Sequence, residues 1–311
     1  MNNTRKIRTL RKIISITSTV FFLLSAYLSY CALARCERTA RSVTEALTLS
    51  SSAVIPSVII FCATYKIMLP RLYAIFSKMQ GVARFFSLSP AGLCMVASGM
   101  LSGFPTGAFI YAEMRKKGMI SREEGLSLLP LSNNASAPFL IGAVGGKMFC
   151  NVRFGALLFI SQALAVLLLL FLTRGERKGV ARQAVRAGKI TFGSVAAAIG
   201  GCGSAMVTVC AFIVFFKAAA DAIVFDFAPD FLKTAVYSAL EISSGLNALS
   251  HLGVCAASAA LAGGTVGFSG LSVMMQVSLI SGEGAKRLFF RKCLLGALCA
   301  TFSFAAYGLF F

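Results

Sequence analysis

Long uncharged apolar runs are the feature that most restricts the fold of this chain. Residues 13–34 and 154–173 contain no charged side chain, and about 20 apolar residues are enough to cross the hydrocarbon core of a bilayer. Residues 190–216 are also uncharged, and 293–311 form a last apolar run. With 57% hydrophobic and 13% charged residues among 311, the chain is predicted to be an all-α polytopic membrane protein.

The first apolar run follows a strongly basic N-terminal segment, residues 5–12. This order imitates a secretory signal, but the run is too long for a signal peptide. We therefore predict a retained anchor helix with its N-terminus on the cytoplasmic side, followed by an external loop over residues 35–48.

The net charge of +19 does not indicate nucleic-acid binding. The basic residues stand mainly in short segments between apolar runs, as expected for topology signals that face the cytoplasm and anionic lipid. The densest of them, residues 174–189, has no interleaved aromatic side chains on which bases could stack. The ten cysteines contain no CxxC pair, and Cys31 with Cys36 is only a weak candidate for a disulfide. No cofactor, metal site or enzyme motif is predicted.

The stretch "SGFPTGA" at residues 102–108 places helix breakers inside an apolar segment. We interpret residues 89–112 as an outward crossing that is broken at Gly103 and Pro105, which leaves the loop 113–124 outside. Ser121 and Glu124 have the spacing of a capping box. Residues 125–151 are apolar but are interrupted by Pro, Asn and Ser, so we expect a re-entrant hairpin there.

The second half repeats this order from the opposite side of the membrane. Residues 190–216 cross outward, 231–250 cross back with "EISSG" in mid-span, and 254–282 form a second hairpin. The cluster of Lys286, Arg287, Arg291 and Lys292 then lies in the cytoplasm. The expected parts are 1–49 (basic N-terminus, anchor helix and external loop), 50–173 (repeat 1), 174–189 (basic cytoplasmic loop) and 190–311 (repeat 2).

Two inverted repeats that contain broken helices and hairpins are typical of secondary transporters, whose substrates bind at unwound backbone near the midplane. Glu241 is a carboxylate in an apolar span, where a charge is costly and usually functional. His251 is expected near the inner end of the same span. The residues expected to contact substrate are Ser102, Gly103, Pro105, Asn133, Asn134, Ser136, Glu241, Ser244, Gly245, Ser269 and Gln276.

Four segments resemble sporulation integral membrane proteins of the YlbJ type, which belong to a wider group with a gate or nucleoside-recognition domain. They are "SGFPTGA" (102–108), "SNNASAPFLIGAVG" (132–145), "LEISSG" (240–245) and "GFSGLSVMMQV" (267–277). The resemblance implies a multi-pass protein of the bacterial cytoplasmic membrane that is linked to spore formation. It implies no particular substrate. Members of this family often carry His where Met274 stands and a small residue where Lys147 stands, so a mechanism that uses that His is not carried over.

Two principal hypotheses follow. In the first, the protein moves a small polar solute, such as a nucleoside-like molecule or an organic ion, by rocking one repeat against the other. In the second, it is a membrane scaffold or regulator of spore-envelope assembly that transports nothing. A membrane enzyme would need an acid–base pair, for which only Glu241 with His251 is available. The expected partners are the solute and membrane lipid, without nucleic acid, and homo-oligomerisation stays open.

Overall fold

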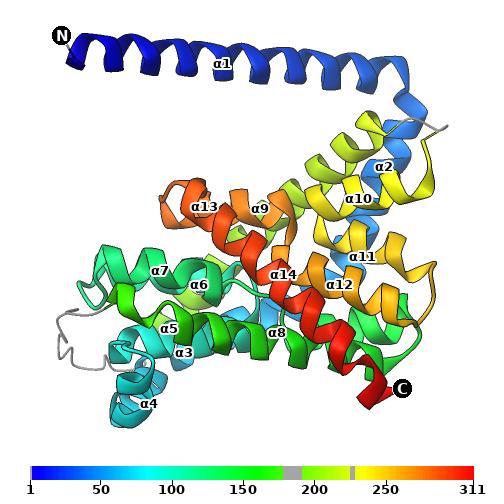
Figure 1. The fold of residues 1–311 in the computed structure, drawn as a ribbon. Coiled ribbons are helices and arrows are strands. Elements are labelled where there is room, and N and C mark those ends of the chain that lie inside the picture. Colours follow the sequence, from blue (N-terminus) through cyan, green and yellow to red (C-terminus); the bar gives the residue numbers. More distant parts are fainter. Residues whose placement is uncertain (1, 178–190, 225–227) are drawn as a thin grey trace.

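The computed structural model describes residues 2–177, 191–224 and 228–311, and every regular element within them is a helix (Figure 1). By length and composition, four of the described helices can each cross a membrane: α8 (Val152–Leu172), α9 (Phe192–Ile223), Ala256–Ser281 and α14 (Ala285–Phe310). The chain is therefore an all-α polytopic membrane protein, as predicted. Most of the predicted basic loop 174–189 lies outside the described residues.

The N-terminal region contains two helices where the sequence predicted one helix and a loop. α1 (Asn2–Ala34) stands apart from the other helices in Figure 1, and its Phe21 and Phe22 side chains are exposed, as suits contact with lipid. At Arg35 the chain turns into α2 (Cys36–Leu49), so the predicted external loop 35–48 is wrong. Residues 18–34 and 36–52 meet at an angle of 102° and count as a fifth span only if they are taken together.

Residues 89–112 form a re-entrant hairpin and not the predicted crossing. α5 (Pro90–Ser102) and α6 (Thr106–Lys116) meet at the break. A Cβ added to Gly99 would lie 1.8 Å from the Ser132 carbonyl oxygen, and one added to Gly107 would lie 2.2 Å from the same atom. In a continuous helix these two glycines would be about 12 Å apart, so the chain must fold back between them.

Residues 125–151, predicted as a hairpin, belong instead to a broken crossing. α7 (Arg122–Ser132) and η2 (Pro138–Met148) follow α8 in the opposite direction along its length. At one end Gly145 packs on Gly155, and midway the backbone of Ala135 is hydrogen-bonded to the side chain of Gln162. The start of α7 reaches the region of residues 86–89, where the other end of α8 is also anchored through η3 (Arg174–Arg177).

In the second repeat, too, the segment predicted to cross the membrane forms a hairpin, and the segment predicted as a hairpin forms a crossing. α10 (Asp230–Leu240) and α11 (Ile242–Ser250) form a hairpin, because a Cβ on Gly245 would lie 2.5 Å from the Ser238 Cα. α12 (Ala256–Phe268) and α13 (Gly270–Ser281) together make the 26-residue span Ala256–Ser281. The predicted crossing 231–250 and the predicted hairpin 254–282 are therefore both wrong.

Each repeat consists of a hairpin, a broken crossing and a long helix, and the two repeats run in opposite directions (Figure 1). Hairpin α5–α6 enters from the left of this view and hairpin α10–α11 from the right. Small residues allow the close packing within each repeat, since Gly267 lies against the backbone of α14 at Leu295 and Gly296. The remaining helices are η1 (Ser50–Val54), α3 (Ile55–Lys78) and α4 (Gln80–Phe85).

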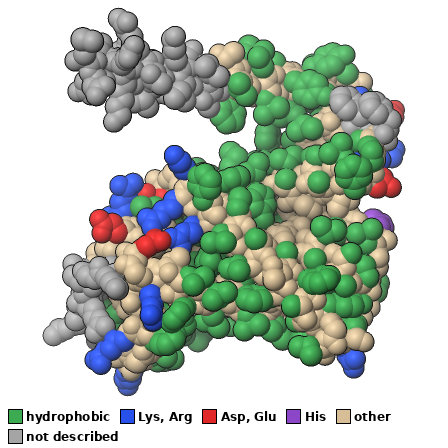
Figure 2. All heavy atoms as spheres, viewed as in Figure 1, with side chains coloured by type: hydrophobic (Ala, Val, Ile, Leu, Met, Phe, Trp, Pro, Cys, Tyr) green, Lys and Arg blue, Asp and Glu red, His purple; other side chains and the backbone are tan. Residues whose placement is uncertain are grey.

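Charged side chains gather mainly at one end of the molecule, at the left in Figure 2, while apolar side chains cover its flank. Arg122 binds Glu283, and Arg287 binds Glu176, so the loops after α6, α8 and α13 meet on one face. The loop 113–124 therefore lies on the same face as Arg174–Arg177 after α8, whereas the sequence placed these two segments on opposite sides of the membrane. His251 follows α11 at the opposite end of the molecule from this face, whereas the sequence placed it on the same side as Lys286 and Arg287.

Two buried cysteines provide a test of how α3 packs on α9. The Cys62 and Cys202 sulfur atoms are 3.1 Å apart, and a disulfide needs only a small approach from that distance. We expect a membrane-permeant oxidant to join them. With a protease site inserted in 178–190, the two fragments should then stay together on a non-reducing gel. Fragments that separate, as they should in a Cys62→Ser control, would contradict this packing.

Candidate functional site

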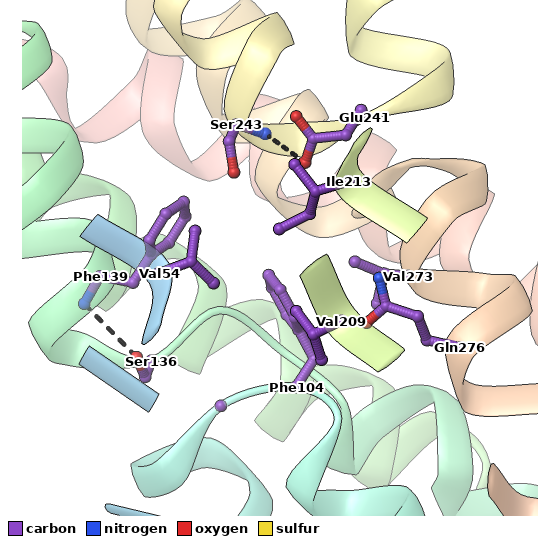
Figure 3. Close-up of a pocket in the computed structure, with 11 residues that line it drawn as sticks. Val54, Phe104, Ser136, Phe139, Val209, Ile213, Glu241, Ser243, Val273 and Gln276 are labelled. Atoms are coloured by element: carbon purple, nitrogen blue, oxygen red, sulfur yellow. Dashed lines mark hydrogen bonds between the residues drawn. The ribbon is translucent and has the colours of Figure 1, made fainter. Parts of the chain in front are cut away.

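A narrow cavity lies where the two hairpin tips meet the broken crossings (Figure 3). Repeat 1 contributes Gly103 and Phe104 from its hairpin and Ser136 from its break, while repeat 2 contributes Glu241 from its hairpin and Gln276 from α13. The cavity has room for about one water molecule in this conformation. The structure is thus closed around a site to which both repeats contribute.

The walls of the cavity are mostly apolar. Phe104 and Phe139 meet edge to face with their ring centroids 6.2 Å apart, and Val209 and Ile213 of α9 form another wall (Figure 3). An apolar wall with a few fixed polar groups is the usual composition of a small-molecule site. Four of the eleven predicted site residues, Gly103, Ser136, Glu241 and Gln276, are among the lining residues.

Gln276 carries a polar atom that has no partner. Its side chain is 1% exposed and donates from Nε2 to the Ser272 hydroxyl over 3.2 Å, while Oε1 accepts no hydrogen bond. A buried acceptor without a donor costs about 1–3 kcal/mol. Because Gln276 lines the cavity, a solute with an N–H or O–H group is able to complete its hydrogen bonds.

Glu241 is the N-cap of α11. One carboxylate oxygen accepts from the Ser243 N–H at 3.0 Å, and the other accepts from the Ser244 N–H at 2.7 Å and from the Ser244 hydroxyl at 2.9 Å. A carboxylate at a helix N-terminus is stabilised by the free N–H groups and by the helix dipole. The buried charge is therefore held by its own hairpin, at the wall of the cavity.

Asn133, Asn134 and Ser269 lie at the breaks of the two crossings and surround a residue that sequence reasoning placed in the cytoplasm. Lys292 is fully buried in α14, which begins eight residues before the predicted last span. Its Nζ donates to the Asn133 carbonyl at 2.5 Å, the Asn134 Oδ1 at 3.2 Å and the Ser269 hydroxyl at 3.1 Å. The predicted cytoplasmic position of Lys292 is wrong.

The remaining predicted residues support the breaks from behind the cavity. The Ser102 hydroxyl donates a hydrogen bond to the Ser98 carbonyl at the end of α5. Pro105 precedes α6, and Gly245 packs on Ser238. Ser244 bonds Glu241, as described above. These four residues shape the hairpins but do not line the cavity.

Gln162 was missed by the sequence analysis and supports the first break. From the middle of α8 its Oε1 accepts from the Ala135 N–H at 3.0 Å, and its Nε2 donates to the Ala135 carbonyl at 2.8 Å. Both residues are fully buried. Satisfying unwound backbone in this way is what permits a break at membrane depth. A single amide in an otherwise apolar span was the available sequence signal.

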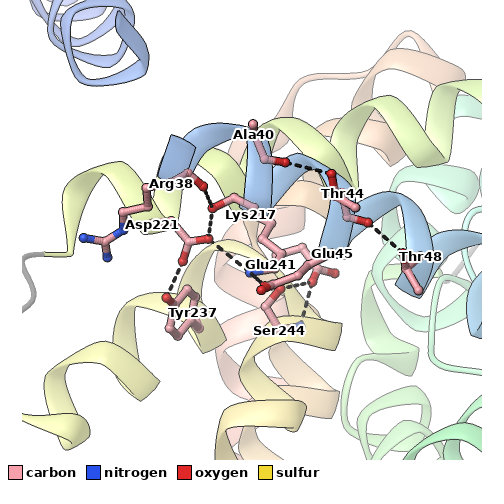
Figure 4. A network of polar contacts seen from close by, with 11 residues as sticks. Arg38, Ala40, Thr44, Glu45, Thr48, Lys217, Asp221, Tyr237, Glu241 and Ser244 are labelled. Atoms are coloured by element: carbon pink, nitrogen blue, oxygen red, sulfur yellow. Dashed lines mark hydrogen bonds and ion pairs between the residues drawn. The ribbon is translucent and has the colours of Figure 1, made fainter. Parts of the chain in front are cut away.

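A second polar cluster connects α2, α9 and α10 (Figure 4). Asp221 of α9 accepts from the hydroxyls of Ser42 and Tyr237 and pairs with Lys217 over 3.1 Å. Lys217 also pairs with Glu45. Each charge here has a partner, so the cluster fastens α2 and hairpin α10–α11 to α9.

No metal-binding group of three or more His, Cys, Asp or Glu side chains occurs among the described residues. Glu241 and His251 cap opposite ends of the unbroken helix α11, so they do not form an acid–base pair in this conformation. Within the same residues Cys31 and Cys36 are free thiols.

Comparison with known proteins gives one partial match. Sporulation integral membrane protein YlbJ of Bacillus subtilis (strain 168) is 37% identical over 73 residues. These residues are 24% of this chain and 18% of that protein, so the chain matches about a fifth of the relative's length. No family model and no solved structure matches the chain. The match agrees with a multi-pass membrane protein and supports the YlbJ resemblance over this segment only.

Proposed function

We propose that this protein is a transporter that moves a small polar solute across the bacterial cytoplasmic membrane by alternating access, in a cell that forms spores. The observation that carries the proposal is the free Gln276 acceptor in a closed cavity to which both inverted repeats contribute. Inverted repeats that meet at broken helices favour this function, because one repeat can tilt against the other around a central site. The role in sporulation rests on the name of the partial relative.

The chemistry of the cavity indicates the class of solute. Gln276 Oε1 requires a donor, Ser136 and Ser243 add polar groups, and the Phe104 and Phe139 rings suit a flat apolar part. A nucleoside-like molecule or a small organic ion combines these features. The cavity must widen to admit either, since it holds about one water molecule when closed.

The charge distribution supports an orientation. Arg115, Lys116 and Lys117 end α6, and Arg122 pairs with Glu283 just before α14, on the face that also holds Arg287. Cytoplasmic loops carry the excess of Lys and Arg. This face would be cytoplasmic. With residues 18–52 and α3 each taken as one crossing, this orientation would put the N-terminus inside as well.

A panel of nucleosides, bases, amino acids, organic anions and metal ions tests the proposal through thermal unfolding of the purified protein. A ligand at about 100 times its Kd adds about 2.7 kcal/mol to the stability of the state it binds. We expect one class to stabilise the wild type and the exposed control Gln80→Leu, but not Gln276→Leu. If a well-folded protein responds to no compound, the scaffold hypothesis replaces transport.

Glu283 is expected to hold the cytoplasmic entrance closed, because it joins the two repeats. Its carboxylate accepts from the Tyr111 hydroxyl at 2.7 Å and from Arg122 through bonds of 2.9–3.1 Å. The Arg122 side of this pair is exposed to water, which weakens the contact. A cysteine at Val273, in the cavity wall, should therefore react modestly faster with a charged thiol reagent in Glu283→Gln than in the wild type.

The sign of the pH dependence follows from the same contacts. The hydrogen bonds from Arg122 lower the pKa of the Glu283 carboxyl in the folded protein. The interaction is thus complete above the ordinary Glu value of about 4.3 and is lost as the pH falls through the lowered value. Equal labelling rates in wild type and Glu283→Gln at neutral pH would show that this contact is no gate. Cysteine at fully buried Ala259, outside the cavity lining, is the control.

A further inference from the structure

Lys292 differs from the other basic residues at the start of α14. Arg287 and Arg291 pair with Glu176 at the surface, whereas Lys292 is 0% exposed. Among the described residues, no carboxylate lies within 4.0 Å of its Nζ. An isolated buried charge is too costly to persist, so other groups must stabilise it.

The three partners of Nζ are all restricted to accepting. Asn133 offers a backbone carbonyl. The Asn134 amide donates its Nδ2 to the Leu131 carbonyl at 2.6 Å, which leaves Oδ1 directed at the lysine. Ser269 donates its hydroxyl proton to the Val266 carbonyl at 3.0 Å and can only accept from Lys292. Three acceptors match the three donors of an ammonium group and not those of a neutral amine.

Two helix ends supply the compensating negative potential. α7 ends at Ser132 and α12 ends at Phe268, so the C-terminal ends of both helices converge on Nζ. The C-terminus of a helix carries a partial negative charge that favours cations. Backbone carbonyls and helix C-terminal ends at broken membrane helices are also the groups that coordinate small cations.

We propose that Asn133 O, Asn134 Oδ1 and Ser269 Oγ form a monovalent-cation site that the chain fills with its own Lys292 ammonium. The site joins the break of repeat 1 to the break of repeat 2. With a tethered cation in place, the contact between the repeats needs no sodium or potassium from solution. We call these three oxygen atoms the oxygen cage. The inference does not depend on whether a solute is transported, because it concerns only which cation the cage holds.

Thermal unfolding of purified Lys292→Ala tests the proposal. Chloride salts of Na⁺, K⁺, ammonium and propylammonium are titrated at constant ionic strength, with choline, which is too large for the cage, as the balancing cation. We expect at least one small cation to raise the unfolding midpoint of the variant saturably, by roughly 5 °C near saturation, with no such rise in the wild type. The rise should disappear in Lys292→Ala/Ser269→Gly, which loses one oxygen at a φ of 70° that glycine tolerates.

Several results would overturn the assignment. If Lys292→Ala folds but no small cation raises its unfolding midpoint, the cage is no cation site. The same conclusion follows if a cation raises the midpoint equally after the Ser269 hydroxyl has been removed. Lys292→Met gives a second measurement if the alanine variant does not fold in any salt. Replacing a merely trapped charge by an apolar side chain of similar length should stabilise the protein, whereas removing a required cation should lower the ratio of folded to unfolded protein at least ten-fold.

Discussion

Gly99→Ala is expected to cost the protein about 3 kcal/mol, at the upper end of the usual cost of overpacking. The new methyl group would lie 1.8 Å from the Ser132 carbonyl oxygen, and backbone cannot move aside as a flexible side chain can. Hairpin α5–α6 would then separate from the first break. Loss of monodisperse protein in detergent and a lower unfolding midpoint would be measured.

Gly200→Ala is the matched control. Gly200 lies in α9, is exposed, and has no atom within 4 Å of the added Cβ, so alanine should be neutral or slightly stabilising through its higher helix propensity. Equal stability of the two variants would mean that α5 and α6 are not packed at Ser132 as the structure has them.

Gln162→Leu has the second large expected effect, a loss of about 2–4 kcal/mol. Leucine keeps most of the side-chain volume but leaves the buried N–H and C=O of Ala135 without partners, and each such group costs about 1–3 kcal/mol. The neighbouring Ser161→Ala removes a buried hydroxyl that has no partner. Because an unpaired buried hydroxyl is itself costly, its removal should leave the protein equally stable or make it more stable.

Denaturant or thermal unfolding of the two variants side by side measures this difference. A stable Gln162→Leu protein would show that water or another group satisfies Ala135. The unwound backbone of the first break would then not depend on Gln162 of α8 for its hydrogen bonds.

The sequence was sufficient to predict the class of fold and the inverted repeat, but it did not distinguish hairpins from crossings. A crossing followed by a hairpin brings the chain to the same side as a hairpin followed by a crossing, so the charged loops before and after such a pair of segments cannot separate the two arrangements. The basic residues 115–117 held the missing signal. They fit a cytoplasmic loop, which requires that 89–112 returns to its starting side.

The breaks in the helices were placed correctly from the sequence, whereas the contacts of their polar groups were not. Lys292 was grouped with its basic neighbours because it precedes an uncharged run. Helical periodicity puts it on one stripe with Leu288, Leu295 and Cys299, which are all buried in α14. A lysine on a buried stripe is unusual enough to have been singled out. Its partners lie 23 to 159 residues away, beyond the reach of any local pattern.

The arrangement of the hairpins is the central claim, and labelling of single cysteines with an impermeant maleimide in sealed vesicles tests it most directly. The background lacks the exposed Cys36, Cys150 and Cys293. Single cysteines replace Arg84, before hairpin α5–α6 in the chain, and Lys117, after it. Two further variants replace Asp230, at the start of hairpin α10–α11, and Leu252, after it. The account predicts that each pair is labelled from one side of the membrane, with the two pairs on opposite sides. Labelling of Arg84→Cys and Lys117→Cys from opposite sides would contradict it, because α5 and α6 would then form a crossing.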